Sequence, residues 1–433
     1  MQRVAVFGMG YVGCVTAACL SRDGHQVIGV DVDEDKVGAI SIGKSPVFEP
    51  GLDELIQECV DAGSLRATTD ASEAIAHSDM ALVAVGTPSG SDGGVSTIAI
   101  ERVVEAIGTA LCGDNRHYTV TIRSTLLPGI LEETLIPLLE RSLGEGVGTN
   151  IVLCNHPEFL RETTAIRDYD DPPFILVGAE SADQAQPVFD LYNRCDAECI
   201  ATDTRTAALV KYACNAFHAL KIDFGNELGT LAKSFGADGQ DVMRIVCRDT
   251  RLNISPAYLR PGFAFGGSCL PKDVRALTRH AQRHAISTDV LNAILPSNEA
   301  HLERALKAIR ETGHRKVGLI GLSFKAGTDD LRESPLVILA ETLLGRGYDL
   351  KIYDPGVRVA HLTGTNLAYV DRHLPHLAKL LDDDPAELYS HAELLIVGTD
   401  IANDLDWTAA YSGDVFDLRR DLVVPTRAPL AMP

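Results

Sequence analysis

Paired cysteines and clustered metal ligands are what this sequence lacks. Its ten cysteines are scattered singly, with no Cys-x-x-Cys pair and no Cys/His spacing typical of a zinc site. The pattern argues against a disulfide scaffold, and we expect no bound metal. Most of the thiols, Cys14 and Cys19 among them, are predicted to be packing residues of a protein kept in a reducing compartment.

Positive charge and long apolar runs are also scarce. The formal net charge of −21 argues against binding to nucleic acid or to an anionic membrane, both of which need basic surface. It leaves room for an anionic small ligand, because a local cluster of Lys, Arg and backbone N–H groups can hold a phosphate. No stretch approaches 18 uninterrupted apolar residues, and no signal-peptide core precedes the first strand. We therefore expect a cytoplasmic protein.

The N-terminal segment has the pattern of a dinucleotide site. A short apolar strand at residues 3–7 leads into Gly8-Met9-Gly10-Tyr11-Val12-Gly13, an apolar helical run, and a second strand at residues 26–30 that ends in Asp31. In such a unit the first glycine makes the tight turn, the second admits the pyrophosphate, and the third lets helix and strand pack. An acid at position 31 suits the ribose hydroxyls and favours NAD over NADP.

Further strands are expected at residues 81–85, 119–122, 151–153 and 174–177, alternating with helices. This order predicts a parallel, doubly wound sheet. Thr87 and Thr125 lie in loops that follow two of these strands, where such sheets bind their ligands.

A proline-free helical stretch from Thr204 to Phe235 is expected to join two domains. A second strand–turn–helix unit begins at residues 316–321, with later strands at 350–353 and 394–397. The predicted fold class is α/β, with two Rossmann-like doubly wound parallel-sheet domains joined by a long central helix. We place the domains at residues 1–202, 203–300 and 301–433, the last binding a nucleotide other than the first.

One cysteine, Cys269, has the surroundings of a reactive thiolate. Gly266 and Gly267 precede it and allow a ligand to approach closely, and Pro271 can open a helix just after it. A thiol at a helix N-terminus is acidified by the dipole, and Lys272 adds a cation. Asp273 supplies a carboxylate that could orient a water molecule or hold the lysine. The plainer alternative is a buried structural cysteine beside a tight turn.

Polar residues recur on two further segments. Lys211, Asn215 and His218 fall at i, i+4 and i+7 of the long helix, which is either a solvated face or part of a site between domains. Glu158 and Glu162 lie four residues apart after a strand, and would share one face if that segment is helical.

A thiolate and a dinucleotide form a coherent pair. A cysteine can add to an aldehyde, and the thiohemiacetal can give a hydride to NAD⁺, leaving a thioester that water hydrolyses. Lys211 and Asn215 would stabilise the oxyanion, and a carboxylate would act through water as the base.

From Arg3 to about Arg420 the chain resembles the UDP-glucose/GDP-mannose dehydrogenases, which oxidise the C6 alcohol of a nucleotide sugar to the acid with two NAD⁺. The resemblance rests on five motifs in order: the glycine turn at 8–13, Val85-Gly86-Thr87-Pro88, Pro157-Glu158-Phe159-Leu160-Arg161-Glu162, the cysteine segment at 266–273, and residues 324–335.

Weaker features indicate GDP-mannose as the substrate and GDP-mannuronate as the product, for an acidic polysaccharide such as alginate. They are residues 164–169 with Pro172-Pro173, His218, residues 260–265 and residues 322–335. UDP-glucose, giving UDP-glucuronate, is the alternative. The chain departs from the family pattern at His156, where Asn or Ser is usual, and at Ala257, where the GDP-mannose branch would place an aromatic residue.

The resemblance also implies residue roles. Cys269 is the expected nucleophile, Lys211 and Asn215 hold the oxyanion, and Glu162 and Asp273 transfer protons with a water near Thr125. The expected NAD contacts are Gly8, Gly10, Tyr11, Val12, Gly13, Asp31, Lys36, Thr87, Thr125, Lys272 and Arg332. The expected substrate contacts are Glu162, Lys211, Asn215, His218, Asn226, Tyr258, Arg260, Phe263 and Lys325.

Members of the family pair through the central helix, so a homodimer or a higher homo-oligomer is expected. Two other functions remain open from the residues alone. One is a non-catalytic nucleotide-sugar sensor, which would need neither Cys269 nor Asp273. The other is a two-electron alcohol dehydrogenase, which would release an aldehyde and have no use for the cysteine.

Overall fold

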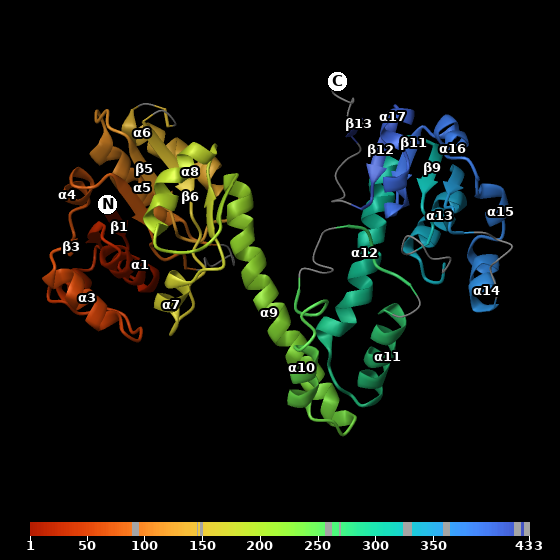
Figure 1. The fold of residues 1–433 in the computed structure, drawn as a ribbon, viewed down its shortest axis with the longest axis horizontal. Coiled ribbons are helices and arrows are strands. Elements are labelled where there is room, and N and C mark those ends of the chain that lie inside the picture. Colours follow the sequence, from red (N-terminus) through yellow and green to blue (C-terminus); the bar gives the residue numbers. More distant parts are fainter. Residues whose placement is uncertain are drawn as a thin grey trace. The chain divides into compact units, whose positions relative to one another are not determined.

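The computed structural model describes residues 1–88, 95–144, 146–147, 150–255, 262–267, 270–323, 331–357, 364–419 and 426–427. The chain divides into two compact units, Met1–His218 and Ala219–Pro433. The boundary between them falls within one long helix, labelled α9 in Figure 1. The division into three domains at 202/203 and 300/301 therefore stays a prediction.

The first unit is built on an eight-stranded sheet, counted over the described residues, in the order β3-β2-β1-β4-β5-β6-β7-β8. Its strands are β1 (Arg3–Phe7), β2 (Gln26–Val30), β3 (Leu65–Thr68), β4 (Met80–Val83), β5 (Tyr118–Ile122), β6 (Ile151–Asn155), β7 (Ile175–Gly178) and β8 (Cys199–Thr202). The first six strands are parallel to one another. β7 runs antiparallel to β6, and β8 runs parallel to β7. The predicted α/β class is confirmed, with these two strands reversed.

Helices cover both faces of this sheet, as Figure 1 shows. Alternate residues of β1 point into different cores: Val4 and Val6 pack with α1, α3, α7 and α8, whereas Ala5 and Phe7 pack with α4, α5 and α6. Strands buried on both faces are apolar at nearly every position, which is why the sequence located them well. The helices are α1 (Tyr11–Arg22), α2 (Glu34–Ser41), α3 (Leu52–Asp61), α4 (Ala71–Ala76), α5 (Ile98–Leu111), α6 (Ile136–Leu143), α7 (Ala165–Asp170) and α8 (Ala182–Phe189), with a π-helical turn at Leu131–Leu135 and a 3₁₀ turn at Asp190–Tyr192.

The strand order creates a switch point at β1. The chain crosses from β1 to β2 on one side through α1, and later returns to place β4 on the other side. The loops that leave the carboxyl ends of β1 and β4 therefore diverge, which opens the crevice in which such sheets bind ligands.

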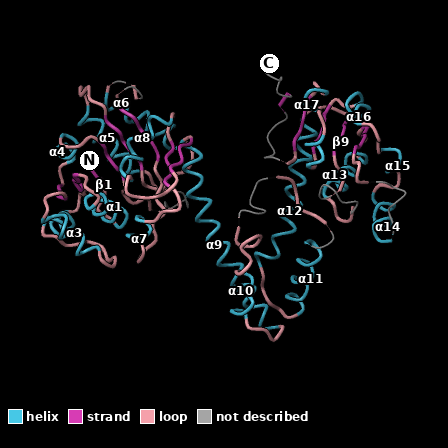
Figure 2. Tube along the Cα trace, viewed as in Figure 1, coloured by secondary structure: helices cyan, strands magenta, loops and turns pink. Residues whose placement is uncertain are grey.

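The long helix α9 (Thr204–Ser234) confirms the prediction for residues 204–235 to within one residue (Figure 2). At its start Ala207 and Ala208 are buried in the first unit, and near its end Leu231 joins a small core with Ala281 and Leu291 of the second.

The second unit combines helices with a five-stranded sheet, counted over the described residues, in the order β10-β9-β11-β12-β13. All its neighbouring strands are parallel except β13, which runs antiparallel to β12. The strands are β9 (Lys316–Ile320), β10 (Asp349–Tyr353), β11 (Leu394–Val397), β12 (Asp414–Asp417) and β13 (Thr426–Arg427). The helices are α10 (Gly239–Val246), α11 (Leu270–Arg283), α12 (Asp289–Glu311), α13 (Pro335–Gly345), α14 (Gly364–His373), α15 (Leu377–Leu380), α16 (Pro385–His391) and α17 (Trp407–Ala410), with a 3₁₀ turn at Asp400–Asp404.

Two cores hold this second sheet. Apolar residues of α12 and α13 pack on one face, and Leu388 of α16 packs on the other with Tyr411. α11 begins at Leu270 with Pro271 in its first turn, as the sequence predicted. None of the described helices is both long enough and apolar enough to cross a membrane.

Candidate active site

The glycine turn between β1 and α1 has the geometry of a pyrophosphate site. Gly8 has φ +95°, and a Cβ on it would lie 2.9 Å from the Ala84 carbonyl oxygen. A Cβ on Gly13 would lie only 1.8 Å from the Gly8 carbonyl oxygen, so this chain's own packing requires both glycines. A Cβ on Gly10 would meet nothing within 4 Å. The middle glycine thus faces open space directly before the N-terminus of α1, where free N–H groups attract an anion.

Asp31 lies at the carboxyl end of β2, where the ribose of a dinucleotide is bound in this fold. Its Oδ2 accepts a hydrogen bond from the Met9 N–H at 2.7 Å, and its Oδ1 accepts one from the Asp33 N–H at 3.0 Å. Lys36 Nζ lies 3.3 Å from Oδ2. The predicted pair of Asp31 and Lys36 is therefore brought together, and the carboxylate is held against the glycine turn.

Two threonines complete this edge of the sheet. Thr87 follows β4 and Thr125 follows β5, and both are half-buried. Ser124 ties the two loops together, because its hydroxyl lies 2.7 Å from the Val85 carbonyl oxygen. The glycine turn, the acid and these loops all lie at the carboxyl edge, and together they fit a nicotinamide dinucleotide.

A second group of polar residues surrounds Lys211 on α9. This lysine is 7% exposed, and its Nζ donates a hydrogen bond to Glu158 Oε1 at 2.9 Å. The ammonium also lies 5.5 Å from the centre of the Phe159 ring. Glu158 Oε2 accepts a hydrogen bond from the Leu160 N–H at 2.7 Å. A buried cation needs such a partner, since an unpaired charge in the interior is very costly.

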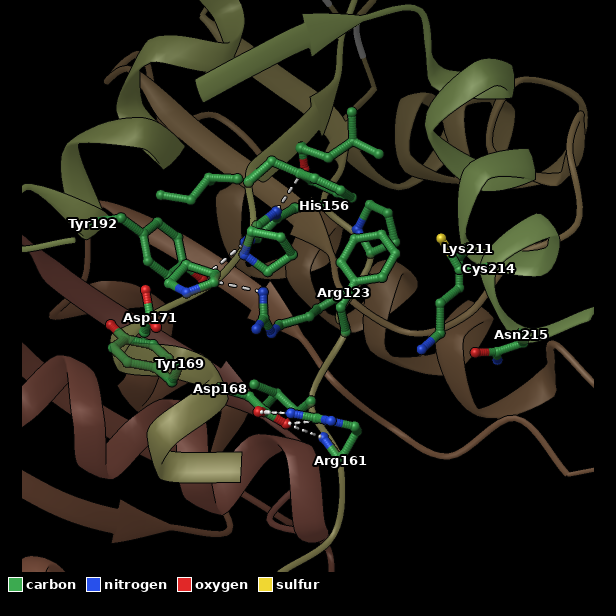
Figure 3. A pocket seen from close by; sticks show the side chains of 18 of the residues that line it. Arg123, His156, Arg161, Asp168, Tyr169, Asp171, Tyr192, Lys211, Cys214 and Asn215 are labelled. Carbon is green, nitrogen blue, oxygen red and sulfur yellow. Dashed lines mark hydrogen bonds and ion pairs between the residues drawn. The ribbon is translucent and has the colours of Figure 1, made fainter. Parts of the chain in front are cut away.

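Lys211, Asn215 and His218 line one cavity of about 330 Å³, drawn in Figure 3. The helical stripe predicted from the sequence therefore faces a hollow in the first unit. Cys214 of the same helix also lines it, beside Lys211. The remaining lining residues are Arg123, His156, Pro157, Phe159, Leu160, Arg161, Asp168, Tyr169, Asp171, Pro172, Pro173, Phe174, Ile175, Leu176 and Tyr192.

His156, the residue that departs from the family pattern, is buried in a continuous hydrogen-bonded chain. Arg123 donates to the Tyr192 hydroxyl at 3.1 Å, and that hydroxyl lies 2.8 Å from His156 Nε2. His156 Nδ1 lies 2.8 Å from the Leu176 carbonyl oxygen. Both ring nitrogens of His156 are satisfied when the ring is neutral, with its proton on Nδ1. Burial, and secondarily the Arg123 charge, lower the pKa of His156 to about 3.

The segment that carries the two glutamates is not helical, so the condition under which Glu158 and Glu162 would share one helix face is not met. Residues 156–161 are extended or irregular, and α7 begins only at Ala165. Pro157 disfavours a helical conformation at His156, and Thr163 has φ +70°. Such a value costs a threonine about 1–3 kcal/mol. Glu158 instead pairs with Lys211, while Glu162 is exposed.

The strained turn after Glu162 is held by Glu49, a residue that the sequence analysis did not identify. The Glu49 carboxylate accepts hydrogen bonds from the Thr163 and Ala165 N–H groups, each at 2.8 Å, and from the Tyr11 hydroxyl. Burial and the neighbouring Glu49 carboxylate raise the pKa of the Tyr11 phenol. Arg123, Tyr192 and Cys214 were also missed, although Cys214 could have been found from its i+3 spacing to Lys211.

Other predicted site residues lie in the second unit. Lys272 Nζ is 3.3 Å from Asp273 Oδ1, as expected for a carboxylate that holds the lysine. Lys272 and Arg332 line one hollow of about 590 Å³. Phe263 packs against the core of the second sheet, and Asn226 is exposed on α9. Tyr258, Arg260, Cys269 and Lys325 lie outside the described residues.

These features define a class of protein: a dinucleotide-dependent oxidoreductase whose NAD site lies at the carboxyl edge of a doubly wound sheet. Among the described residues no group of His, Cys, Asp and Glu side chains is arranged to hold a metal ion.

Comparison with known proteins identifies the family. Three models of the UDP-glucose/GDP-mannose dehydrogenase family match: the NAD binding domain at residues 2–196, the central domain at 205–300 and the UDP binding domain at 318–426. The chain belongs to this family, and it is an NAD-dependent nucleotide-sugar dehydrogenase.

The relatives include both branches of the family. The GDP-mannose 6-dehydrogenase of Pseudomonas aeruginosa is 46% identical over 397 residues, covering 92% of this chain and 91% of the relative. The UDP-glucose 6-dehydrogenase of Haloferax volcanii is 33% identical over 431 residues, covering 98% and 96%. A crystal structure of a ternary complex of the P. aeruginosa GDP-mannose dehydrogenase superposes with a TM-score of 0.91 at 43% identity, covering 96% of each chain. A UDP-glucose dehydrogenase from Pyrobaculum islandicum superposes with a TM-score of 0.56 at 33% identity, covering 97% and 94%.

The turn glycines provide a matched test of the cofactor site. Gly10→Ala should leave the melting temperature unchanged, because its Cβ meets nothing within 4 Å and its φ of −83° suits alanine. It should raise the Kd for NAD⁺ at least about tenfold by blocking the pyrophosphate. Gly13→Ala should lower the stability by about 1–3 kcal/mol through overpacking. Thermal unfolding and calorimetric NAD⁺ titration measure both effects, and unchanged NAD⁺ affinity in Gly10→Ala would contradict the assignment.

His156 should make the stability depend on pH. The unfolded chain binds a proton at this histidine below about pH 6.5, whereas the folded chain binds one only near pH 3. The contribution of the neutral His156 to the free energy of unfolding is therefore complete above about pH 6.5. Below that pH the free energy of unfolding should fall by up to about 1.4 kcal/mol per pH unit, because the unfolded chain binds a proton that the folded chain does not. Urea unfolding of the wild type and of His156→Gln, a neutral replacement, should show a shallower slope in the variant between pH 5 and 7. Equal slopes would show that His156 titrates normally.

Proposed function

We propose that this chain oxidises the C6 alcohol of GDP-mannose to the carboxylate of GDP-mannuronate, a four-electron change that uses two NAD⁺. One observation supports this chemistry most directly. Lys211 and Asn215 line the same cavity, and the buried ammonium of Lys211 is paired with Glu158. The choice of sugar is supported by the relatives, since the GDP-mannose 6-dehydrogenase of P. aeruginosa is 46% identical and the UDP-glucose enzymes are 33–34% identical. The product would serve an acidic polysaccharide such as alginate.

The nucleophile in this proposal is Cys269. In the sequence it immediately precedes Leu270, where α11 begins, so free N–H groups and the positive end of a helix dipole follow it. Its thiolate adds to the C6 aldehyde to form a thiohemiacetal, which becomes a thioester, and water releases the acid and the thiol. Two molecules of NAD⁺, when bound in turn, would accept the two hydrides, one from the alcohol and one from the thiohemiacetal.

Lys211 and Asn215 stabilise the oxygen that becomes negative. They lie one helical turn apart and face the same cavity, so an ammonium and an amide N–H₂ can both donate to one oxyanion. Glu158 keeps Lys211 in place through the 2.9 Å contact. Glu162 is exposed and therefore accessible to water, which suits it to accept a proton through a bound water molecule.

Counting NADH against the sugar consumed tests both the substrate and the mechanism. About two NADH per GDP-mannose, with little from UDP-glucose, is expected from a route that ends in the acid. Cys269→Ser should reduce acid formation at least about 10³-fold, because a thioester cannot form. Cys112→Ser, at an exposed cysteine at the end of α5, is the control and should behave as the wild type. Two NADH from UDP-glucose alone would assign the other branch, and undiminished turnover in Cys269→Ser would exclude the covalent route.

We also infer that two copies of the chain pair through α9. Residues 215–224 of this helix are exposed at nearly every position, and they include Phe217 (39% exposed), Leu220 (49%) and Ile222 (64%). Apolar side chains on all sides of a helix are typical of a segment that is covered by a partner. The resemblance to a family that pairs through its central helix supports a second copy of the chain as that partner.

Charge on this surface should disrupt the pairing. The double variant Leu220→Glu/Ile222→Glu should move the mass measured by light scattering from that of a dimer or higher oligomer to that of one chain. Ile42→Glu is a matched control, since Ile42 is 65% exposed on a different surface, and it should leave the mass unchanged. A wild type that elutes as a single chain would exclude the pairing.

A further inference from the structure

The buried carboxylate of Glu49 lies between two turns: the glycine turn at the start of α1, which we call the cofactor turn, and the turn that follows Glu162. Glu49 belongs to the connection between α2 and α3, directly before Pro50 and Gly51, and is 6% exposed. Gly51 has φ +80°, so the chain turns sharply after the glutamate and enters α3 at Leu52. A carboxylate in this position must be fully hydrogen-bonded, because its burial is otherwise unfavourable.

Three donors converge on this carboxylate. The Thr163 N–H donates to Oε2 and the Ala165 N–H donates to Oε1, both at 2.8 Å. The third donor is the hydroxyl of Tyr11, the first residue of α1. The Thr163 N–H also lies 3.0 Å from the Tyr11 hydroxyl oxygen. Glu49 and Tyr11 together thus hold the turn after Glu162 against the helix whose N-terminus faces the cofactor.

This contact restricts the backbone immediately beside Glu162. Thr163 has φ +70°, a conformation that a threonine adopts only when its surroundings impose it. On the other side, the Arg161 N–H donates to Asp168 Oδ2 at 3.0 Å. The backbone is therefore fixed both before and after Glu162, while the Glu162 side chain remains exposed.

We propose that Glu49 is a positioning residue that sets the direction of Glu162 for its part in the reaction. The inference rests on the proposed function, in which Glu162 accepts a proton through water. A carboxylate that only stabilised the fold would have no need to join the strained turn after Glu162 to the first residue of the cofactor helix. Through Tyr11, the cofactor turn and the Glu162 turn share a single anchor.

Glu49→Gln is the direct test. The amide keeps the size of the side chain but turns an N–H₂ group toward one of the two backbone N–H donors, so one hydrogen bond is lost. For the folded enzyme we expect kcat with the sugar to fall about 10–100-fold, as for a group displaced by roughly 1 Å. The KM for NAD⁺ should stay within about threefold, because the packing of Gly8 and Gly13 and the contact from Met9 to Asp31 hold the glycine turn even when the contact from Tyr11 to Glu49 is weakened. Hydrogen exchange of the peptide spanning residues 158–168 should become faster.

Glu393→Gln is the matched control. Glu393 also accepts two backbone N–H bonds, from Arg315 at 3.1 Å and Lys316 at 3.3 Å, but it lies at the amino ends of β9 and β11. It should leave kcat and the exchange of 158–168 unchanged. Should Glu49→Gln fail to fold, Tyr11→Phe removes one of the three donors and should give the same faster exchange with a smaller fall in kcat.

The outcomes distinguish the positioning role of Glu49 from the proposed function of the enzyme. Faster exchange with a fall confined to kcat supports the positioning role. Unchanged exchange at 158–168, or a loss of melting temperature with unchanged kcat per folded enzyme, would overturn it. A wild type that forms no NADH from any nucleotide sugar would overturn the proposed function and with it the role of Glu49 in the reaction, while the exchange data would still report whether Glu49 holds the turn.

Discussion

The ion pair between Lys211 and Glu158 is the interaction on which the site depends. It joins the long helix to the segment after β6 across a contact of 2.9 Å, with both side chains largely buried. Removing either partner would leave a buried charge uncompensated, which costs about 3–5 kcal/mol. The pair therefore fixes where α9 passes the sheet. It also keeps a cation at the cavity wall, as the proposed oxyanion-stabilising role of Lys211 requires.

The sheet places the remaining groups around this pair. Its parallel strands bring the glycine turn, Asp31, Thr87 and Thr125 to one edge, so the cofactor and the cavity belong to the same unit. β7 reverses direction after α7, and its start at Ile175 contributes to the cavity wall. β7 thus supplies two adjacent residues, Ile175 and Leu176, to the wall of the cavity.

Features that the local sequence determines were predicted well, whereas those that depend on residues far apart in the sequence were not. β1, β2 and β11 were located to the residue, because strands buried on both faces are continuous apolar runs. The reversal of β7 was missed, since an apolar pattern carries no information on strand direction, and β8 was not predicted as a strand. Whether Glu158 and Glu162 share a helix face was left conditional on a helix, and Pro157 and the positive φ of Thr163 disfavour a helix there. Glu49 gave no local signal, as its partner Thr163 is 114 residues away.

His156 shows how a departure from the family pattern is accommodated. The ring has one donor and one acceptor, and it matches the Leu176 carbonyl and the Tyr192 hydroxyl, so no buried polar atom of the ring is left unsatisfied. Its low pKa keeps it neutral, and the charges on the cavity wall come from other residues. Lys211 is paired with Glu158 and Arg161 with Asp168, whereas Arg123 donates to the neutral Tyr192. A strongly acidic chain thus keeps three cationic side chains, Arg123, Arg161 and Lys211, on the wall of this cavity.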